Sequence, residues 1–231
     1  MRTIGLIGGM TWHSTVDYYR LINEGIHERL GGSHSAEMVL LSVDFDPVEA
    51  MQERGDWAAM GRLMAAAARR LEMAGAAGLV ICANTMHRLA DEVTAAVRIP
   101  LLHIADATAT VVKKRGLRTV GLLGTRYTME LDFYRGRLEK EHGLKALIPD
   151  EPGRTTVHEV IYRELAFGRV LEESRRAYVA IIDDLRRRGA EGVILGCTEI
   201  PLLIRPQDSP VPVFDTTALH AAAAVDFALS G

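Results

Sequence analysis

The chain's two cysteines lie in two stretches of sequence that resemble each other. The stretch "GAAGLVICANT" begins at Gly75 and "GAEGVILGCTE" begins 114 positions later at Gly189, and both end in small polar residues. In an ungapped alignment Cys197 falls on Ala83, and Cys82 lies one position early. A thiol can serve as a general acid, a general base or a nucleophile. The question is whether the protein uses one thiol or two.

Cys197 closes a predicted buried strand and precedes "TEIPLL", which predicts the start of a helix. A helix N-terminus lowers the pKa of a nearby thiol from about 8.5, so we expect a reactive thiolate rather than a structural core cysteine. Neighbouring side chains of a strand point to opposite faces. If Cys197 faces a site, Cys82 therefore points sideways or inward. We interpret Cys82 as structural, with a catalytic role only if a kink ends its strand.

Polar residues follow both cysteine strands. Asn84 and Thr85 begin a predicted helix, where their side chains and backbone N–H groups suit a carboxylate, although an ordinary N-cap explains them equally well. Thr198 and Glu199 are the counterparts in the second stretch, and Glu199 lies two residues from the thiol. His87, in the first turn of the first helix, is more simply explained as a structural histidine.

Composition limits the possible functions. The chain has 231 residues, a formal charge of −3 and a pI near 6.2, which gives no reason to expect a nucleic-acid partner. No apolar run reaches the roughly 20 residues of a membrane span, and the N-terminal run is too short for a signal peptide. Two cysteines without a CxxC motif favour a reducing cytoplasm. No His, Cys, Asp and Glu cluster has the spacing of a metal site.

Short apolar runs alternate with longer amphipathic ones, which predicts an α/β fold. The strands lack polar alternation, as is typical of parallel sheets buried on both faces. Predicted strands span residues 3–7, 38–43, 78–82, 101–104, 119–123, 192–195 and 211–214. Predicted helices span residues 15–30, 57–74, 86–97, 105–115, 128–141, 156–167, 171–188 and 216–229, and residues 46–57 read as a polar loop.

The sequence also repeats itself. The segment "IGLIGGMTWHSTVDYYR" resembles "VGLLGTRYTMELDFYR", and "RIPLLHIADATA" resembles "SPVPVFDTTALHA". We therefore predict two pseudo-symmetric lobes, each a roughly four-stranded parallel sheet flanked by helices, with a ligand cleft between the lobes. The first lobe is residues 1–104, joined by the C-terminal helix 216–231, and the second lobe is residues 105–215.

No cofactor is expected. The turn Gly8-Gly9 after the first strand is not the GxGxxG fingerprint of dinucleotide-binding folds. A pyridoxal enzyme needs a sequestered lysine for its Schiff base. All four lysines fall in charged helical surroundings, and they are Lys113, Lys114, Lys140 and Lys145.

The chain resembles the cofactor-independent aspartate/glutamate racemases over essentially its full length. The motifs are "IGLIGGM", "RRLEMAGAAGLVICANTMH" and "GAEGVILGCTEIP". The resemblance implies a homodimer that binds a small acidic amino acid and moves its α-proton between two cysteines on opposite faces of the α-carbon. It implies that Cys197 is catalytic. By residue match it implies substrate contacts from Met10, Gln52, Ala83, Asn84, Thr85, Thr198 and Glu199.

Two residues depart from the family pattern. The family places its first cysteine directly before the Asn-Thr pair, where this chain has Ala83, which has no proton to give. Typical aspartate racemases also carry a lysine where "IYRELAFGR" has Ala166. The segment "AMQERGDW", with Gln52, resembles a subgroup specific for L-aspartate and L-glutamate. We therefore expect a slow racemase with a non-standard opposite face.

Two other functions fit the same residues. One thiol is enough to protonate a carbanion from a single face, as a decarboxylase or isomerase of a small diacid would require. Alternatively, the chain is a non-catalytic relative that binds an amino acid. The sequence does not choose between aspartate and glutamate.

Overall fold

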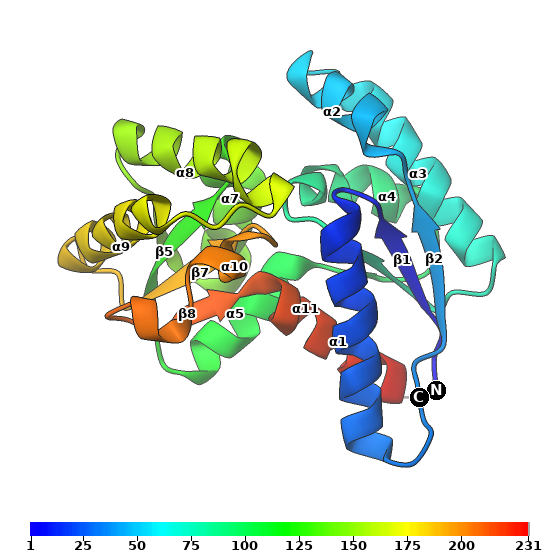
Figure 1. Cartoon of the computed structure of the whole chain (residues 1–231). Helices are drawn as coiled ribbons and strands as arrows, with labels where there is room; N and C mark the ends of the chain where they lie inside the picture. Colours follow the sequence, from blue (N-terminus) through cyan, green and yellow to red (C-terminus); the bar gives the residue numbers. More distant parts are fainter. Residues whose placement is uncertain (231) are drawn as a thin grey trace. The chain divides into compact units, whose positions relative to one another are not determined.

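The structure is a computed structural model that describes residues 1–230. The chain forms two compact units (Figure 1). Unit 1 contains residues 1–104 and the segment from His220 onward, and unit 2 contains residues 105–219. Two helices contribute to both units: α5 (Ile104–Lys114) and α11 (Thr216–Leu229). The last part of α11 is tied to the chain's beginning, because the N–H of Arg2 donates to the carbonyl of Ala228 at 2.9 Å.

Unit 1 is built around a four-stranded parallel sheet of order β2-β1-β3-β4. Its strands are β1 (Ile4–Gly8), β2 (Met38–Ser42), β3 (Gly78–Ile81) and β4 (Leu101–Leu102). Its helices are α1 (Trp12–Leu30), α2 (Phe45–Glu53), α3 (Trp57–Met73), the 3₁₀ helix η1 (Thr85–Leu89) and α4 (Ala90–Ala96).

Unit 2 has a four-stranded parallel sheet of order β6-β5-β7-β8. Its strands are β5 (Thr119–Gly124), β6 (Lys145–Leu147), β7 (Gly192–Gly196) and β8 (Val213–Asp215). Its helices are α6 (Arg126–Glu130), α7 (Asp132–His142), α8 (Glu151–Arg163), η2 (Leu165–Phe167), α9 (Glu172–Arg187), α10 (Ile200–Leu203) and η3 (Pro206–Asp208).

The two sheets have the same strand order, since adding four to each strand number in β2-β1-β3-β4 gives β6-β5-β7-β8. This confirms the prediction of two similar α/β lobes with parallel sheets. The repeated stretches occupy equivalent places, because β3 and β7 each pair with the first strand of their unit on one side and the last on the other.

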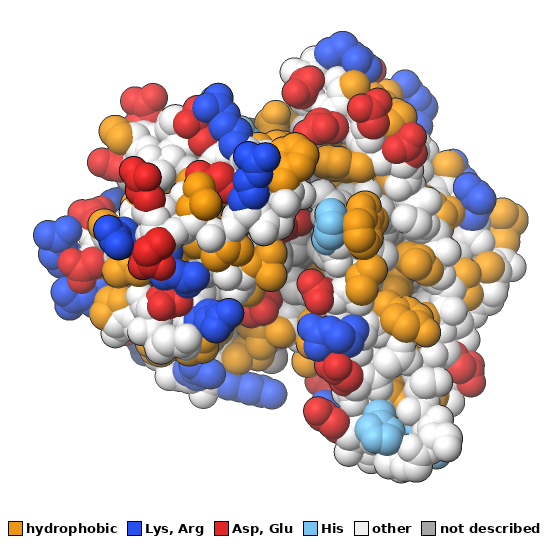
Figure 2. Space-filling view, viewed as in Figure 1, with side chains coloured by type: hydrophobic (Ala, Val, Ile, Leu, Met, Phe, Trp, Pro, Cys, Tyr) orange, Lys and Arg blue, Asp and Glu red, His pale blue; other side chains and the backbone are white. Residues whose placement is uncertain are grey.

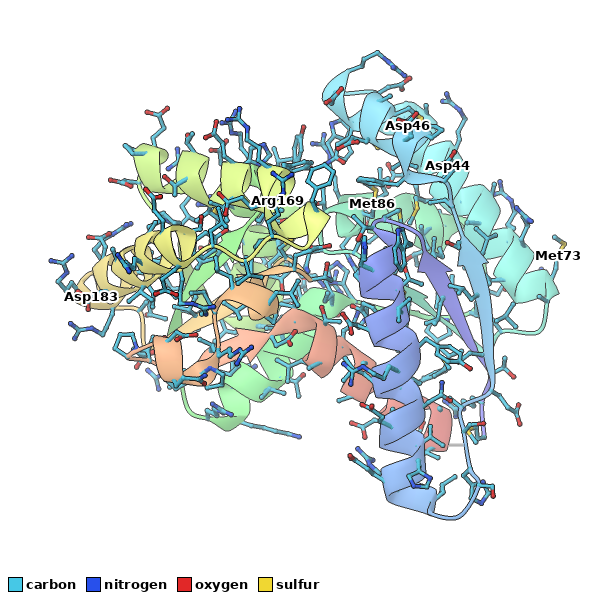
Figure 3. All side chains as sticks on the ribbon, viewed as in Figure 1. Asp44, Asp46, Met73, Met86, Arg169 and Asp183 are labelled. Atoms are coloured by element: carbon cyan, nitrogen blue, oxygen red, sulfur yellow. The ribbon has the colours of Figure 1, made fainter. Side chains whose placement is uncertain are left out.

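Several elements differ from the sequence-based predictions. The predicted helix 128–141 is divided into α6 and α7, and the predicted helix 86–97 into η1 and α4. Strand β6 was not predicted, because its three residues are too few to show a hydrophobic pattern. The predicted polar loop 46–57 was wrong over most of its length, since α2 runs from Phe45 to Glu53. Pro47 lies in the first turn, where its missing N–H breaks no helical hydrogen bond. Val48 and Gln52, four residues apart, form the buried face of α2. Figure 3 labels Asp44 and Asp46 at the start of this helix.

Side chains at the end of β3 alternate between two hydrophobic clusters of unit 1. Leu79, Ile81 and Ala83 belong to the cluster formed with α3, whereas Val80 and Cys82 belong to the cluster formed with α1 and α11. The α3 helix ends at Met73, which projects from its C-terminal end with 79% of its surface exposed (Figure 3). In unit 2, Val193, Leu195 and Cys197 share one cluster with residues of α8 and α9.

This alternation confirms how the two cysteine stretches correspond. At the offset of the repeat, Leu79, Ile81 and Ala83 match Val193, Leu195 and Cys197, and each set lies on a single face of its sheet. Cys82 lies on the other face of its sheet.

Within residues 1–230, no helix is both long and apolar enough to cross a membrane. The same residues contain no group of three or more His, Cys, Asp or Glu side chains placed to hold a metal ion.

Candidate active site

Cys197 follows the last residue of β7, at a point where two strands come very close. Gly124 at the end of β5 pairs with Gly196 at the end of β7. A Cβ atom on Gly124 would lie 2.7 Å from the carbonyl oxygen of Gly196, and one on Gly196 would lie 2.9 Å from that of Leu123. Both contacts are shorter than backbone atoms allow, so only glycine fits. The glycine before Cys197 therefore allows β5 and β7 to approach closely at the carboxyl end of the sheet, where the thiol lies.

The Cys197 thiol is hydrogen-bonded to a carboxylate. Its Sγ donates to Oε2 of Glu199 at 2.9 Å, and the hydroxyl of Thr198 donates to the same oxygen at 2.7 Å. Cys197 and Glu199 are both buried, with 7% and 9% of their surface exposed. Three residues expected to contact substrate or carry chemistry are thus brought together at the end of β7.

The expected lowering of the Cys197 pKa was wrong. Burial of the thiol and the nearby Glu199 carboxylate raise the pKa of Cys197 well above its ordinary value. The following helix α10 contains only four residues, from Ile200 to Leu203, so its dipole is too small to offset these effects. The resting pair is therefore a neutral thiol that donates to a carboxylate.

The equivalent strand end in unit 1 carries no thiol on the corresponding face. Ala83 is 7% exposed, Asn84 is buried and Thr85 is half-buried. Asn84 precedes η1 but makes no side-chain cap, so the N-cap interpretation of Asn84 fails. Cys82 is completely buried among apolar side chains, and this burial strongly raises the pKa of its thiol.

The other predicted contacts of unit 1 are also buried. Met10 packs in the same cluster as Ala83 and Met86, and Figure 3 labels Met86 beside the N-terminal end of α1. Gln52 is 5% exposed and lies in the last turn of α2 rather than in a loop. Its place in a helix fixes the direction of its side chain more firmly than a loop would.

His13 and His87, the two histidines closest in sequence to these strand ends, differ in their surroundings. His13, in the first turn of α1, is exposed and stacks on Trp12 with ring centroids 3.8 Å apart. His87 is buried, and its Nδ1 lies 2.8 Å from the carbonyl oxygen of Ala83. His87 thus contacts the backbone of a predicted substrate contact.

Hydroxyl groups hold the loops at both strand ends, and the sequence analysis did not single them out. In unit 1, the N–H of Gly9 donates to Thr15 at 2.8 Å, and Ser14 donates to the carbonyl of Cys82 at 3.3 Å. In unit 2, the hydroxyl of Thr216 donates to the carbonyl of Leu195 at 2.8 Å. The available signal was the repeat itself, since these residues lie in the repeated segments.

The unit 2 geometry can perform proton transfer. A neutral thiol can give a proton to a carbanion, and it becomes a base once an adjacent carboxylate has accepted its proton. Glu199 is such an acceptor, at hydrogen-bonding distance from Sγ.

Comparison with known proteins gives consistent matches. A model of the Asp/Glu/hydantoin racemase family matches residues 7–224 of the chain. The structure of a Yersinia pestis protein provisionally named an Asp/Glu racemase is 53% identical, covers all of both chains and superposes with a TM-score of 0.95.

Two further structures are similar over nearly the whole chain. An aspartate racemase homologue from Pyrococcus horikoshii OT3 is 37% identical over 99% of each chain, with a TM-score of 0.85. The aspartate racemase of Picrophilus torridus is 25% identical over 99% of this chain and 94% of that one, with a TM-score of 0.74. These similarities extend over both units.

Proposed function

We propose that this chain, which belongs to the Asp/Glu/hydantoin racemase family, interconverts the enantiomers of aspartate or glutamate. The family and the similar structures support amino-acid racemase activity, which makes the protein an isomerase. The observation that carries the mechanism is the hydrogen bond from the Cys197 thiol to Glu199.

The first half of the proposed reaction removes the α-proton. The S–H bond of Cys197 breaks as its proton moves to Oε2 of Glu199, which leaves a thiolate and a carboxylic acid. The thiolate takes the α-proton of the amino acid, so that an S–H bond forms while the C–H electron pair stays on carbon. In the reverse direction, the neutral thiol gives its proton back to the same face of the carbanion.

The second proton has to come from another source. Ala83 carries only a methyl group, and the Cys82 thiol is buried on the other face of the sheet. We therefore assign the second proton to water: an O–H bond of water breaks as the new C–H bond forms, and the hydroxide left behind takes the proton held by Glu199, which restores the resting thiol and carboxylate. A positioned acid or base typically contributes about 10² to 10⁴ in rate, so we expect turnover slower than that of a two-thiol racemase by up to this factor. The equilibrium ratio remains one, since enantiomers have equal free energy in water.

We propose that the reaction needs no pyridoxal cofactor. A Schiff-base lysine has to be sequestered from water. All four lysines of the chain are exposed, namely Lys113, Lys114, Lys140 and Lys145.

We also propose that the protein is a homodimer, as the resemblance implies. Its support is an exposed apolar face on α1, where Trp12, Val16 and Tyr19 are 61%, 55% and 56% exposed. Their spacing places them on one side of the helix, and Figure 2 shows hydrophobic side chains over the N-terminal part of α1, with charged side chains further along it. Light scattering would measure the mass in solution, and a monomer at micromolar concentration would contradict this part of the proposal.

The experiment that tests the function is α-proton exchange in D₂O. L-aspartate and L-glutamate are incubated separately with the protein, with the Cys197→Ala variant as control. NMR follows entry of deuterium at the α-carbon, and chiral chromatography follows the D-enantiomer. We expect exchange together with inversion, and both should be lost in the control.

Each other outcome has a defined meaning. Exchange with retention of configuration would show that Cys197 works on one face alone, so the protein would not be a racemase. Turnover of a diacid that lacks an amino group would favour a decarboxylase or isomerase. Tight binding of L-glutamate without exchange would identify a binding protein.

A further inference from the structure

The two ring nitrogens of His87 have opposite hydrogen-bonding roles. Nδ1 lies 2.8 Å from the carbonyl oxygen of Ala83, and Nε2 lies 3.2 Å from the backbone nitrogen of Ile104. A carbonyl oxygen can only accept and a backbone N–H can only donate. The ring therefore carries its single proton on Nδ1 and is neutral. This tautomer is imposed from both sides by the backbone.

A second buried histidine is fixed in the opposite tautomer. Nε2 of His220 donates to the carbonyl of Leu102 at 2.7 Å, so Nδ1 accepts from the hydroxyl of Tyr18 at 2.8 Å. The ring centroid of His87 lies 5.5 Å from that of His220 and 4.6 Å from that of His103. This histidine network ties the ends of β3 and β4 to α1 and α11, within unit 1.

The network keeps His87 uncharged. His87 is 2% exposed, and His220 and Tyr18 are completely buried. Burial lowers the pKa of His87 well below its ordinary value, and the neighbouring His103 and His220 lower it further. The backbone carbonyl groups of Ala83 and Leu102 favour the protonated ring, but their effect on the pKa is smaller than that of burial.

The backbone held by this network contains Ala83 and Asn84, two of the predicted substrate contacts of unit 1. Three successive carbonyl groups accept hydrogen bonds: that of Cys82 from Ser14, that of Ala83 from the His87 ring and that of Asn84 from the His87 N–H at 3.1 Å. A peptide group is planar and trans, so its C=O and N–H point in opposite directions. Fixing the carbonyl of Ala83 on His87 therefore directs the N–H of Asn84 away from the ring.

We propose that His87 is a positioning residue, which through its Nδ1–H sets the orientation of the peptide between Ala83 and Asn84 for binding of the acidic substrate. This inference rests on the proposed function. His87 acts through the backbone, because both of its ring nitrogens are occupied by backbone groups. It assigns a role to a histidine that the sequence analysis treated as structural.

Two substitutions separate the two hydrogen bonds of the ring. In His87→Asn the amide nitrogen replaces Nδ1 and can still donate to Ala83, while the bond from Ile104 is lost. In His87→Gln the amide oxygen replaces Nε2 and can still accept from Ile104, while the bond to Ala83 is lost. Each variant therefore keeps one of the two hydrogen bonds.

The expected result is a difference in kcat/KM for α-proton exchange at equal folded fraction. His87→Asn should stay within about threefold of the wild type, and His87→Gln should lose about tenfold or more, as misplacement of a binding group does. His220→Gln is the matched control: it keeps the donor to Leu102, disturbs the same network and does not touch Ala83. It should lower the melting temperature without the loss seen in His87→Gln. Equal kcat/KM in the two His87 variants, or a better His87→Gln, would overturn the proposal.

NMR of the full chain separates this inference from the proposed function. Nitrogen-15 spectra should show the His87 ring protonated on Nδ1 and bare on Nε2 between about pH 5 and 8. The Asn84 amide signal should stay near its wild-type position in His87→Asn and move in His87→Gln. A wild type without α-proton exchange would refute the racemase, whereas the other tautomer, or an Asn84 amide that ignores both variants, would refute the positioning role.

Discussion

The ends of β3 and β7 are equivalent in place and different in chemistry. The two strands have the same position in the order of their sheets, and side chains at the end of each strand alternate between the two faces of the sheet. On the face that they share, unit 2 has Cys197 bonded to Glu199, whereas unit 1 has the methyl group of Ala83. The thiol of unit 1 lies one position away, in the core.

This difference shows that a shift of one position along a strand decides whether a cysteine is placed for catalysis or is buried in the core. The period of a strand is two, so a shift of one position moves a side chain to the other face. Two cysteines in two similar stretches are therefore not evidence of a pair of catalytic thiols.

Removing each thiol in turn tests whether Cys197 is catalytic and Cys82 structural. Cys197→Ala should reduce the rate of α-proton exchange by about 10² to 10⁴, as loss of an acid/base group does. Cys82→Ala should leave the exchange rate within about twofold and lower the free energy of unfolding by about 1 kcal/mol, since a buried sulfur leaves a small cavity. Kinetics at matched folded fraction and urea titration measure the two effects. A large kinetic loss in Cys82→Ala would show that the core thiol takes part.

Adding a thiol to unit 1 tests whether the two strand ends are equivalent. Ala83→Cys places a thiol at the position that corresponds to Cys197, and we expect inversion to become about tenfold faster or more. Ala83→Ser is the control, because it adds a similar volume with a much weaker acid. An Ala83→Cys variant that folds normally but racemises no faster would contradict the equivalence of the two strand ends.

The carboxylate beside Cys197 should matter less than the thiol itself. Glu199→Gln keeps the size of the side chain and removes the group that accepts the thiol proton, so we expect about a tenfold loss in kcat. The loss should be smaller at high pH, where more of the thiol ionises without help. A pH–rate profile with the same shape in wild type and variant would argue against proton transfer to Glu199.

The two units should also respond differently to acid. The lowered pKa of His87 means that below about pH 6.5 the unfolded chain binds a proton that folded unit 1 does not. Stability then falls by about 1.4 kcal/mol per pH unit until His87 is itself protonated in the folded chain. The groups that face His87 are His103 and His220, and His220 in turn contacts Tyr18.

Unit 2 contains one half-buried histidine with a pKa lowered by burial, His158, and we expect it to have a smaller effect than the fully buried His87. The other acid-sensitive contact of unit 2 titrates at lower pH. Burial alone would raise the pKa of Asp106, but hydrogen bonds from Arg137 and His142 lower it overall. A carboxylate with a lowered pKa stabilises the fold above its unfolded pKa of about 3.9 and loses that effect as pH falls further. Hydrogen exchange measured by mass spectrometry should therefore show protection lost from unit 1 at higher pH than from unit 2. Simultaneous loss near pH 4 would contradict this order.

Much of this architecture could be predicted from the sequence, because buried parallel strands are continuous apolar runs and the repeat fixes their correspondence. The face of Cys197 relative to Ala83 followed from strand periodicity alone. Other features depend on contacts distant in sequence. The pKa of Cys197 is set by burial and by the rotamer of Glu199, and α2 is helical because its buried face packs on the rest of unit 1.

The histidine network shows the same limit. Tyr18, His87 and His220 lie far apart in the chain, and their hydrogen bonds exist only once α1, η1 and α11 have assembled. No local pattern marks them as partners. What the sequence does show is that His220 lies in the last repeated segment.

The path of the chain has a consequence for protein synthesis. Unit 2 is one continuous segment, whereas the hydrophobic cluster around Tyr18 and Ile22 of unit 1 includes Ala221, Ala224 and Val225 from α11. Domains commonly fold from the N-terminus while the chain leaves the ribosome. Here the first unit to emerge cannot complete its core until the final helix has been made. The buried side of α1 can pack on β1 and β3 early, but it lacks the part of its covering that α11 provides until that helix has been made. Unit 2 can therefore reach its native state first.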